Sequence, residues 1–180
     1  MKYDVDNIKL IISDVDGVWT DGSIYIGNNH TQLPLEVKKF SVLDGVGVAM
    51  AKAANINIVL ISGRYSKATE IRAKELGIKN VFNGTLNKLP IYNDLKRKYG
   101  LEDNQIVYIG DDLIDIQVMK KVGIPIAVAN AILKVKDIAI YITEKPGGKG
   151  AFREAVEWLL VKQGRLGDIL TIMDKNVQKI

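Results

Sequence analysis

Short apolar segments alternate with longer amphipathic segments along most of this chain, and this alternation limits the folds that it can adopt. Strands buried in a parallel sheet are apolar throughout, whereas the helices that cover the sheet are apolar on one face only. The pattern therefore predicts an α/β fold, a parallel sheet with helices on both faces. Strands are expected at residues 8–13, 58–61, 81–82, 106–109, 124–128 and 138–142, and helices at 45–54, 66–76, 89–99, 112–121 and 151–163.

The length of the chain is that of one domain. Its 180 residues, 47% of them hydrophobic, can enclose one well-buried core but are too few for two independent cores. We expect the domain to span residues 1–164 and to carry a short β-hairpin flap at about 21–41. Residues 165–180 form a C-terminal tail with apolar residues at roughly helical spacing, which packs either on its own subunit or on a neighbouring one.

The composition argues against several classes of function. The 25 basic and 21 acidic residues are scattered, which gives little support to nucleic-acid binding. Cysteine is absent, so there are no disulfides and no thiolate metal sites, and the single histidine, His30, lies in a polar stretch typical of a surface turn. No apolar run has the length of a membrane span or the form of a signal peptide, so we expect a cytoplasmic protein with no membrane partner.

Two aspartates stand at the end of the first expected strand. Side chains alternate along a strand, so Asp14 and Asp16 lie on the same side of the chain and direct two carboxylates at one point. Gly17 follows them and allows a tight turn close to a ligand. An isolated motif of this kind is also compatible with a solvated acidic turn, so its meaning depends on the other strand ends.

The ends of the later strands carry further polar residues. Loops at the carboxyl ends of parallel strands converge on one crevice, where such folds bind ligands. Carboxylates gathered there repel one another unless a cation lies among them, and Mg²⁺ prefers oxygen ligands and a substrate phosphate. Besides Asp14 and Asp16, the residues expected at this edge are Thr20, Ser62, Gly63, Arg64, Lys88, Asp111, Asp112 and Asp115.

This set of side chains suits phosphoryl transfer. Asp14 could attack phosphorus to form an aspartyl-phosphate while Mg²⁺ and Lys88 neutralise the phosphoryl oxygens. Asp16 could protonate the leaving alcohol and later activate water. Thr20, Ser62, Gly63 and Arg64 are the expected substrate-binding residues, although a lone hydroxyl or lysine is equally typical of a helix cap or a surface charge.

The ordered motifs resemble those of the haloacid dehalogenase superfamily of phosphotransferases over essentially the whole chain up to Gly164. The motifs are residues 14–20, Ser62, Lys88 and 110–115. The resemblance implies a Rossmann-like fold with Asp14 as the nucleophile and Asp16 as the acid and base. It further implies that the Asp14 carboxylate, the Asp16 carbonyl and Asp111 hold Mg²⁺, and that Asp112 and Asp115 support these ligands directly or through water.

More narrowly, the chain is similar to the 3-deoxy-D-manno-octulosonate (KDO) 8-phosphate phosphatases of lipopolysaccharide biosynthesis. The matching segments are residues 20–22, 40–47, 62–66, 110–112 and 147–154, and neither gap between the early motifs has room for a cap domain. This similarity implies a sugar-acid phosphate substrate and a homotetramer in which the hairpins assemble around the core. It also implies that the C-terminal tail can reach a neighbouring active site.

Two residues bear on which sugar acid is the substrate. Members of this family usually carry arginine where this chain has Leu43, and Trp19 is typical of relatives that act on nine-carbon sialic-type 9-phosphates. Arg64 argues for the eight-carbon substrate because a guanidinium can bind a carboxylate through two hydrogen bonds. A non-catalytic oligomerisation domain and a phosphate-accepting signalling receiver are further alternatives, and the complete set of motifs disfavours both.

Overall fold

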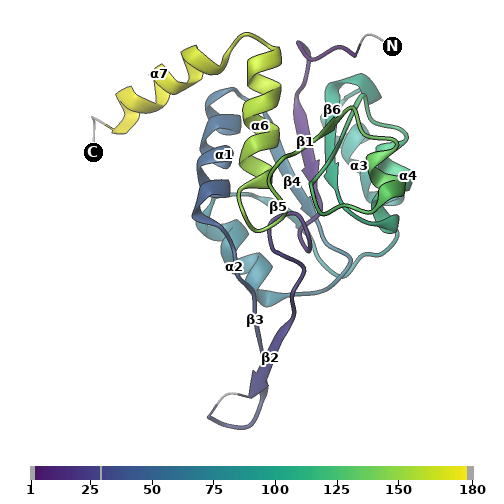
Figure 1. Cartoon of the computed structure of the whole chain (residues 1–180), viewed down its shortest axis with the longest axis vertical. Helices are drawn as coiled ribbons and strands as arrows, with labels where there is room; N and C mark the ends of the chain where they lie inside the picture. Colours follow the sequence, from purple (N-terminus) through teal and green to yellow (C-terminus); the bar gives the residue numbers. More distant parts are fainter. Residues whose placement is uncertain (1–2, 29, 178–180) are drawn as a thin grey trace.

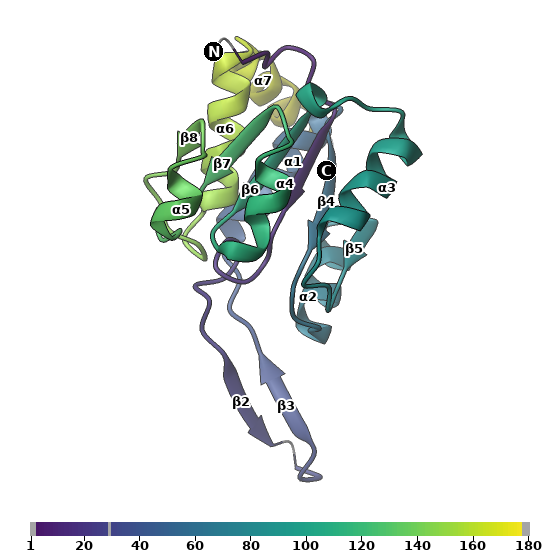
Figure 2. The same cartoon turned by 90° about the vertical axis from the view of Figure 1, so that its right-hand side faces the viewer.

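The computed structural model describes residues 3–28 and 30–177 and confirms the predicted fold class. A six-stranded sheet has the order β5-β4-β1-β6-β7-β8, and every pair of neighbouring strands is parallel. Helices cover both faces of this sheet (Figures 1 and 2). The strands are β1 (Leu10–Ser13), β4 (Asn57–Ile61), β5 (Asn80–Phe82), β6 (Ile106–Gly110), β7 (Ile124–Ala127) and β8 (Tyr141–Ile142).

Strand β1 lies in the middle of the sheet, so all four of its residues are buried, in agreement with the apolar run of Leu10, Ile11 and Ile12. Its neighbours are β4 and β6. After β1 the chain forms β4 and β5 on one side of this strand, and it then crosses over to form β6, β7 and β8 on the other. The carboxyl ends of β1 and β6 therefore lie side by side at the point where the strand order reverses, the usual ligand-binding crevice of such sheets.

The helices occupy the two faces as the sequence pattern predicts. Helices α1, α2 and α6 lie on one side of the sheet, and α3 and α4 lie on the other (Figure 1). No helix among the described residues is long and apolar enough to cross a membrane. The helices are α1 (Val42–Ala53), α2 (Lys67–Glu75), α3 (Leu89–Tyr99), α4 (Ile116–Met119), α5 (Leu133–Lys136), α6 (Ala151–Lys162) and α7 (Leu166–Val177).

Several predicted elements differ from the structure in their bounds; α1, for example, begins three residues earlier than expected, and two elements differ in kind or extent. The helix expected at 112–121 begins as a 3₁₀ turn, Leu113–Asp115, because the Asp115 carboxylate accepts hydrogen bonds from the backbone N–H groups of Asp111 and Asp112 and tightens the first turn. The strand expected at 138–142 is reduced to β8, and the unpredicted helix α5 precedes it. A short apolar run does not by itself separate strand from helix.

The predicted hairpin is present and projects from the sheet as a two-stranded arm (Figure 2). Strands β2 (Tyr25–Asn28) and β3 (Pro34–Val37) pair antiparallel, and Tyr25 lies opposite Val37. Side chains that share one face of this arm are apolar and about half exposed, namely Tyr25, Leu35 and Val37. We call these three residues the outer face of the hairpin.

The C-terminal tail forms helix α7, as the spacing of its apolar residues predicts. Ile169 is buried near its beginning, and Arg165 donates a hydrogen bond to the carbonyl oxygen of Ala54 at the end of α1. Leu170 and Ile172 are more than 40% exposed, and the helix extends beyond the body of the molecule (Figure 1). The first turn of the tail therefore packs on its own subunit, and part of its apolar surface stays exposed.

Asp44 joins helices α1 and α6. It lies in the first turn of α1, is fully buried, and accepts a hydrogen bond from the backbone N–H of Arg153 in the first turn of α6. Gly150, the residue before α6, provides no side-chain cap, so the Asp44 carboxylate takes that role from another helix. Burial raises the pKa of Asp44 to about 6, although the backbone donors of Arg153 and Phe152 act in the opposite direction.

The raised pKa predicts a pH-dependent stability. The folded protein binds the Asp44 proton more tightly than the unfolded chain, so this carboxyl contributes stability below about pH 4 that is lost as the pH rises through about 6. Asp44→Asn keeps an acceptor oxygen and removes the charge. The free energy of unfolding of Asp44→Asn minus that of the unchanged protein should therefore be larger at pH 7 than at pH 4, by about 2 kcal/mol. Urea unfolding at both pH values measures it, and a constant difference would contradict it.

Candidate active site

A buried lysine links the ends of three elements at the carboxyl edge of the sheet. Lys88 precedes α3, and its Nζ lies 2.7 Å from Oδ1 of Asp14 and 2.8 Å from Oδ1 of Asp115. All three side chains are at least 96% buried. Burial lowers the pKa of Lys88, but the charges of Asp14 and Asp115 outweigh this effect and the net shift is upward. Lys88 is therefore a charged ammonium group between two carboxylates.

Asp115 holds this arrangement in place. Its Oδ1 accepts hydrogen bonds from Lys88 and from the Tyr108 hydroxyl at 2.6 Å, and its Oδ2 accepts from the backbone N–H groups of Asp111 and Asp112. Four donors satisfy the carboxylate, so its oxygens are already engaged. Asp115 thus orients Lys88 and the turn that carries Asp111, in keeping with the predicted supporting role.

Asp14 and Asp111 are close enough to share a cation. Together with Asp115 they form a group whose carboxylate oxygens lie within 4.8 Å of one another. Burial and the charge of Asp115 raise the pKa of Asp14 to about 6, and burial and the charge of Asp14 raise that of Asp111 to about 8. Oδ1 of Asp111 is buried without a hydrogen-bond partner among the described residues. Two crowded carboxylates and one unpaired oxygen fit a hard divalent cation.

Gly17 allows Asp111 to approach the loop after β1. A Cβ atom at position 17 would lie 2.0 Å from Oδ2 of Asp111, and the φ angle of Gly17 is +91°. Asn130 donates to the carbonyl oxygen of Gly17 and accepts from the N–H of Gly147, whose own Cβ position would overlap Gly17. The glycine-rich turn before α6 therefore supports the loop that carries Asp14 and Asp16.

Asp16 faces the hairpin side of the site. Its Oδ1 lies 2.5 Å from Nζ of Lys38, which directly follows β3. Its Oδ2 lies 3.3 Å from the Ser62 hydroxyl, whose contact with the carbonyl oxygen of Arg64 is shorter, 2.8 Å. Arg64 follows Ser62 by two residues and pairs with Glu36 of β3 at 3.0 Å. The hairpin stem therefore contributes two charged side chains to the site.

The structure brings most of the predicted site residues together. Asp14, Asp16, Ser62, Lys88, Asp111 and Asp115 are joined by direct contacts or lie in one carboxylate group. The Thr20 hydroxyl is buried and accepts from the N–H groups of Gly17 and Gly22, so it closes the loop. Asp112 is exposed and caps the turn at Leu113. Direct contact of Thr20, Ser62, Gly63 and Arg64 with substrate stays a prediction.

Sequence reasoning missed three residues of the site. Tyr108 was read only as part of an apolar strand, and its hydroxyl contacts Asp115. Glu36 and Lys38 lie in the expected hairpin, and their spacing of two residues was a signal that both face one side of a strand. Which side they face depends on how the hairpin folds back, and a single sequence does not contain that information.

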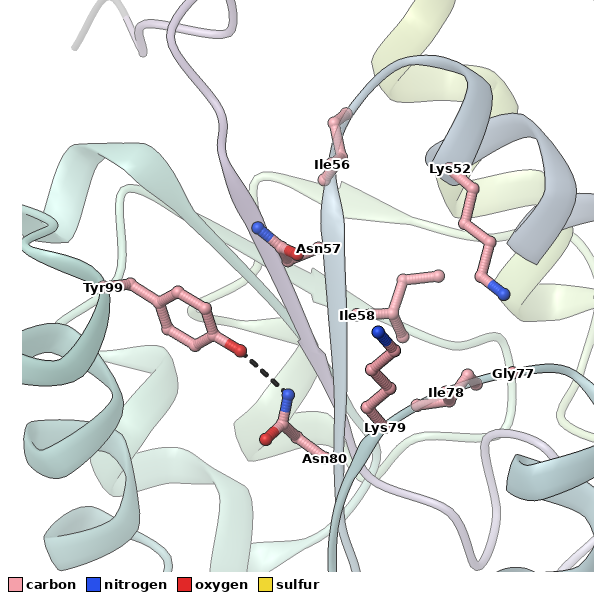
Figure 3. A pocket seen from close by; sticks show the side chains of 9 residues that line it. All are labelled: Lys52, Ile56, Asn57, Ile58, Gly77, Ile78, Lys79, Asn80 and Tyr99. Carbon is pink, nitrogen blue, oxygen red and sulfur yellow. Dashed lines mark hydrogen bonds between the residues drawn. The ribbon is translucent and has the colours of Figure 1, made fainter.

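Two of the cavities lie at opposite edges of the sheet. A groove of about 370 Å³ borders the site beside Lys88 and is lined by Leu86, Leu113, Ile114 and other residues. Another cavity, of about 260 Å³, lies at the amino ends of β4 and β5, where Asn80 is hydrogen-bonded to Tyr99 (Figure 3). Because these strands are parallel to β1, the second cavity is at the far edge from Asp14.

The fold and the carboxylate cluster together define a haloacid dehalogenase-like hydrolase, and the sequence comparison agrees. The family model described as haloacid dehalogenase-like hydrolase matches residues 63–153. The 3-deoxy-D-manno-octulosonate 8-phosphate phosphatase KdsC of Salmonella typhi is 44% identical over 163 residues, which cover 91% of this chain and 85% of that protein. The chain therefore belongs to the 3-deoxy-D-manno-octulosonate 8-phosphate phosphatase family of these hydrolases.

Solved structures of similar proteins share the fold. The enzyme of this name from Yersinia pestis has a TM-score of 0.84 and 40% identity, covering 91% of this chain and 86% of its own. That from Moraxella catarrhalis, in complex with a magnesium ion, a phosphate ion and KDO, has a TM-score of 0.86 and 37% identity, covering 94% and 95%. The Haemophilus influenzae relative was solved in a cobalt-bound form, with a TM-score of 0.81 and 38% identity over 90% and 92% of the two chains.

Gly17 provides a test of the metal site. Gly17→Ala places a methyl group against the Asp111 carboxylate, so Asp111 must move and the affinity for Mg²⁺ should fall by about tenfold or more. Isothermal titration calorimetry with MgCl₂ measures this affinity. Gly22→Ala is the matched control, because Gly22 also has a positive φ angle, +78°, but no atom lies closer than 3.9 Å to its Cβ position. Equal loss of affinity in both variants would contradict the assignment.

Proposed function

We propose that this protein is a Mg²⁺-dependent phosphatase that hydrolyses 3-deoxy-D-manno-octulosonate 8-phosphate to KDO and phosphate. The observation that carries this proposal is the buried contact of Lys88 with Asp14, beside the unpaired Asp111 oxygen. A cation site and a fixed ammonium group next to a carboxylate are what phosphoryl transfer to that carboxylate requires. The similar Moraxella catarrhalis enzyme, whose structure contains magnesium, phosphate and KDO, supports both the cofactor and the substrate.

The residues of the site divide the reaction between them. Asp14 attacks phosphorus and forms an aspartyl-phosphate, and Lys88 neutralises charge on the phosphoryl oxygens. Asp16 protonates the leaving alcohol and then takes a proton from a water molecule, which attacks phosphorus, breaks its bond to Asp14 and releases phosphate. Asp14, the Asp16 carbonyl and Asp111 would hold Mg²⁺, which would supply further positive charge to the phosphoryl oxygens. The Ser62 hydroxyl and the adjacent backbone N–H groups donate hydrogen bonds to the phosphoryl oxygens.

The eight-carbon substrate is favoured over the nine-carbon one. The relatives compared above carry the name of the eight-carbon enzyme. In the structure, Leu43 packs near the Gly150 turn, and Arg64 pairs with Glu36 at the hairpin. Arg64 is 42% exposed, so its guanidinium is accessible to a substrate carboxylate. The intact cluster around Lys88 also argues against a non-catalytic role.

Phosphate release from a panel of sugar phosphates tests this proposal. With MgCl₂ present, the value of kcat/KM should be highest for the eight-carbon 8-phosphate, lower for a nine-carbon 9-phosphate and lowest for hexose phosphates. Asp14→Asn should lower turnover at least about a thousandfold while the protein stays folded by circular dichroism, because the nucleophile is lost. Asp137→Asn, at the exposed end of α5, is the control and should keep full activity. Undiminished turnover by Asp14→Asn would exclude this mechanism.

We further propose a homotetramer in the cytoplasm, with residues 1–164 as the catalytic domain. The outer face of the hairpin supports the assembly, since Tyr25, Leu35 and Val37 expose apolar surface on a paired two-stranded arm. The exposed Leu170 and Ile172 of α7 support contact between the tail and a neighbouring subunit. A neighbouring copy would cover the substrate in place of a cap domain.

A charge on the outer face should disrupt the assembly. Leu35→Asp would bury an unpaired carboxylate between hairpins and should shift the protein to smaller species in sedimentation velocity measurements. Asn28→Asp adds the same charge on the opposite face of the arm and should leave the sedimentation coefficient unchanged. Identical sedimentation of both variants and the unchanged protein would contradict an interface at the outer face.

A further inference from the structure

Lys38 is a buried cation that the reaction described above does not use. Its side chain is 1% exposed, and Asp16 is the only carboxylate that lies within 4 Å of its Nζ in the described part of the chain. An ammonium group loses much of its hydration on burial and stays charged only where a partner compensates for that loss. The Asp16 carboxylate is this partner, at 2.5 Å.

The hairpin stem delivers Lys38 to this position. Glu36 and Lys38 are two residues apart in extended chain, so both side chains lie on the face opposite the outer face of the hairpin. Glu36 binds Arg64, and Lys38 binds Asp16. Two ion pairs of opposite polarity therefore hold the stem of the hairpin against two different loops at the strand ends.

The short contact of the Asp16 carboxylate is with Lys38. Lys38 contacts Oδ1 at 2.5 Å, whereas the Ser62 hydroxyl lies 3.3 Å from Oδ2 and has a shorter contact, 2.8 Å, with the carbonyl oxygen of Arg64. The Asp16 side chain is 23% exposed, whereas that of Asp14 is 4% exposed, so Asp16 lies on the more open side of the pair. Without Lys38, only the longer contact with Ser62 would restrain the carboxylate, and the Asp16 side chain would be freer to rotate.

We propose that Lys38 is a positioning residue for Asp16, and that the hairpin thereby completes the acid and base group of the site. The proposal rests on the proposed function, since it assigns Asp16 to proton transfer. Lys38 binds Oδ1, so Oδ2 is the oxygen that carries the proton given to the leaving alcohol, and Lys38 acts on that step by fixing the orientation of Oδ2. It does not contribute to the attack by Asp14, which depends on Lys88.

Substrates with leaving groups of different basicity distinguish a role of Lys38 in positioning Asp16 from direct contact with the phosphate or a purely structural role. An alkyl phosphate needs a proton on its leaving oxygen, whereas p-nitrophenolate leaves without one. In single-turnover experiments with Mg²⁺, Lys38→Met should slow release of the alcohol from an alkyl phosphate by about tenfold or more. The burst of p-nitrophenol from p-nitrophenyl phosphate should change by less than about threefold. Lys38→Arg, which keeps the positive charge, should restore part of the loss.

Two comparisons make the test specific to Asp16. Lys39→Met removes the adjacent, exposed lysine and should match the unchanged protein with both substrates. The double variant Asp16→Asn, Lys38→Met should be no slower with the alkyl phosphate than Asp16→Asn alone, because Lys38 acts only through Asp16. Thermal melting of each variant reports any general loss of structure.

The outcomes are distinguishable. Equal slowing with both substrates, or additive losses in the double variant, would overturn the proposal and place Lys38 in direct contact with the phosphate or in a purely structural role. If Lys38→Met shows the same rates as the active parent protein, the proposal for Lys38 is overturned while the proposed function stands. An unchanged protein without Mg²⁺-dependent phosphatase activity would instead refute the proposed function, and the inference with it.

Discussion

The mutual repulsion of Asp14, Asp111 and Asp115 is the constraint on which the rest of this structure depends. Three carboxylates gathered at the ends of two neighbouring strands are unfavourable unless positive charge lies among them. Lys88 supplies part of that charge from the start of α3, and removal of such a buried partner typically costs about 3–5 kcal/mol. The parallel register of β1 and β6, the 3₁₀ turn at Leu113 and the close approach of Asp111 to Gly17 all serve to place these groups.

Much of the fold could be predicted from the sequence because the strands are short, mostly apolar runs and the apolar residues of the helices recur at helical spacing. Helix α3 was predicted with its observed bounds, and α6 differs by one residue at its end. Helix α1 begins three residues earlier than predicted, after the local cap formed by Ser41, and other differences arise from tertiary contacts. Asp115 tightens the start of α4 by bonding to backbone groups, which no pattern of apolar residues reveals. Likewise, Asp44 caps α6 from another helix, so its role depends on packing across 109 positions of the sequence.

The candidate site shows the same division. Asp14, Asp16, Lys88 and Asp111 were predicted because each follows or closely precedes a recognisable element, and parallel strands bring such positions to one edge. The Thr20 hydroxyl accepts hydrogen bonds within the loop, a common role of a threonine in a turn, and its contact with substrate stays a prediction. Lys38 could not be placed, because its position depends on the direction in which the hairpin leaves the sheet.

The hairpin connects assembly to chemistry through its two faces. Its inner side chains, Glu36 and Lys38, bind Arg64 and Asp16 of their own subunit, whereas its outer face exposes Tyr25, Leu35 and Val37. An isolated two-stranded hairpin is marginally stable in water, so the arm gains order from whatever packs on that outer face. If neighbouring hairpins pack there, as proposed, the same contact that forms the oligomer also holds Lys38 beside Asp16. A capless enzyme of this kind would then depend on its assembly for the placement of its acid and base group as well as for substrate cover.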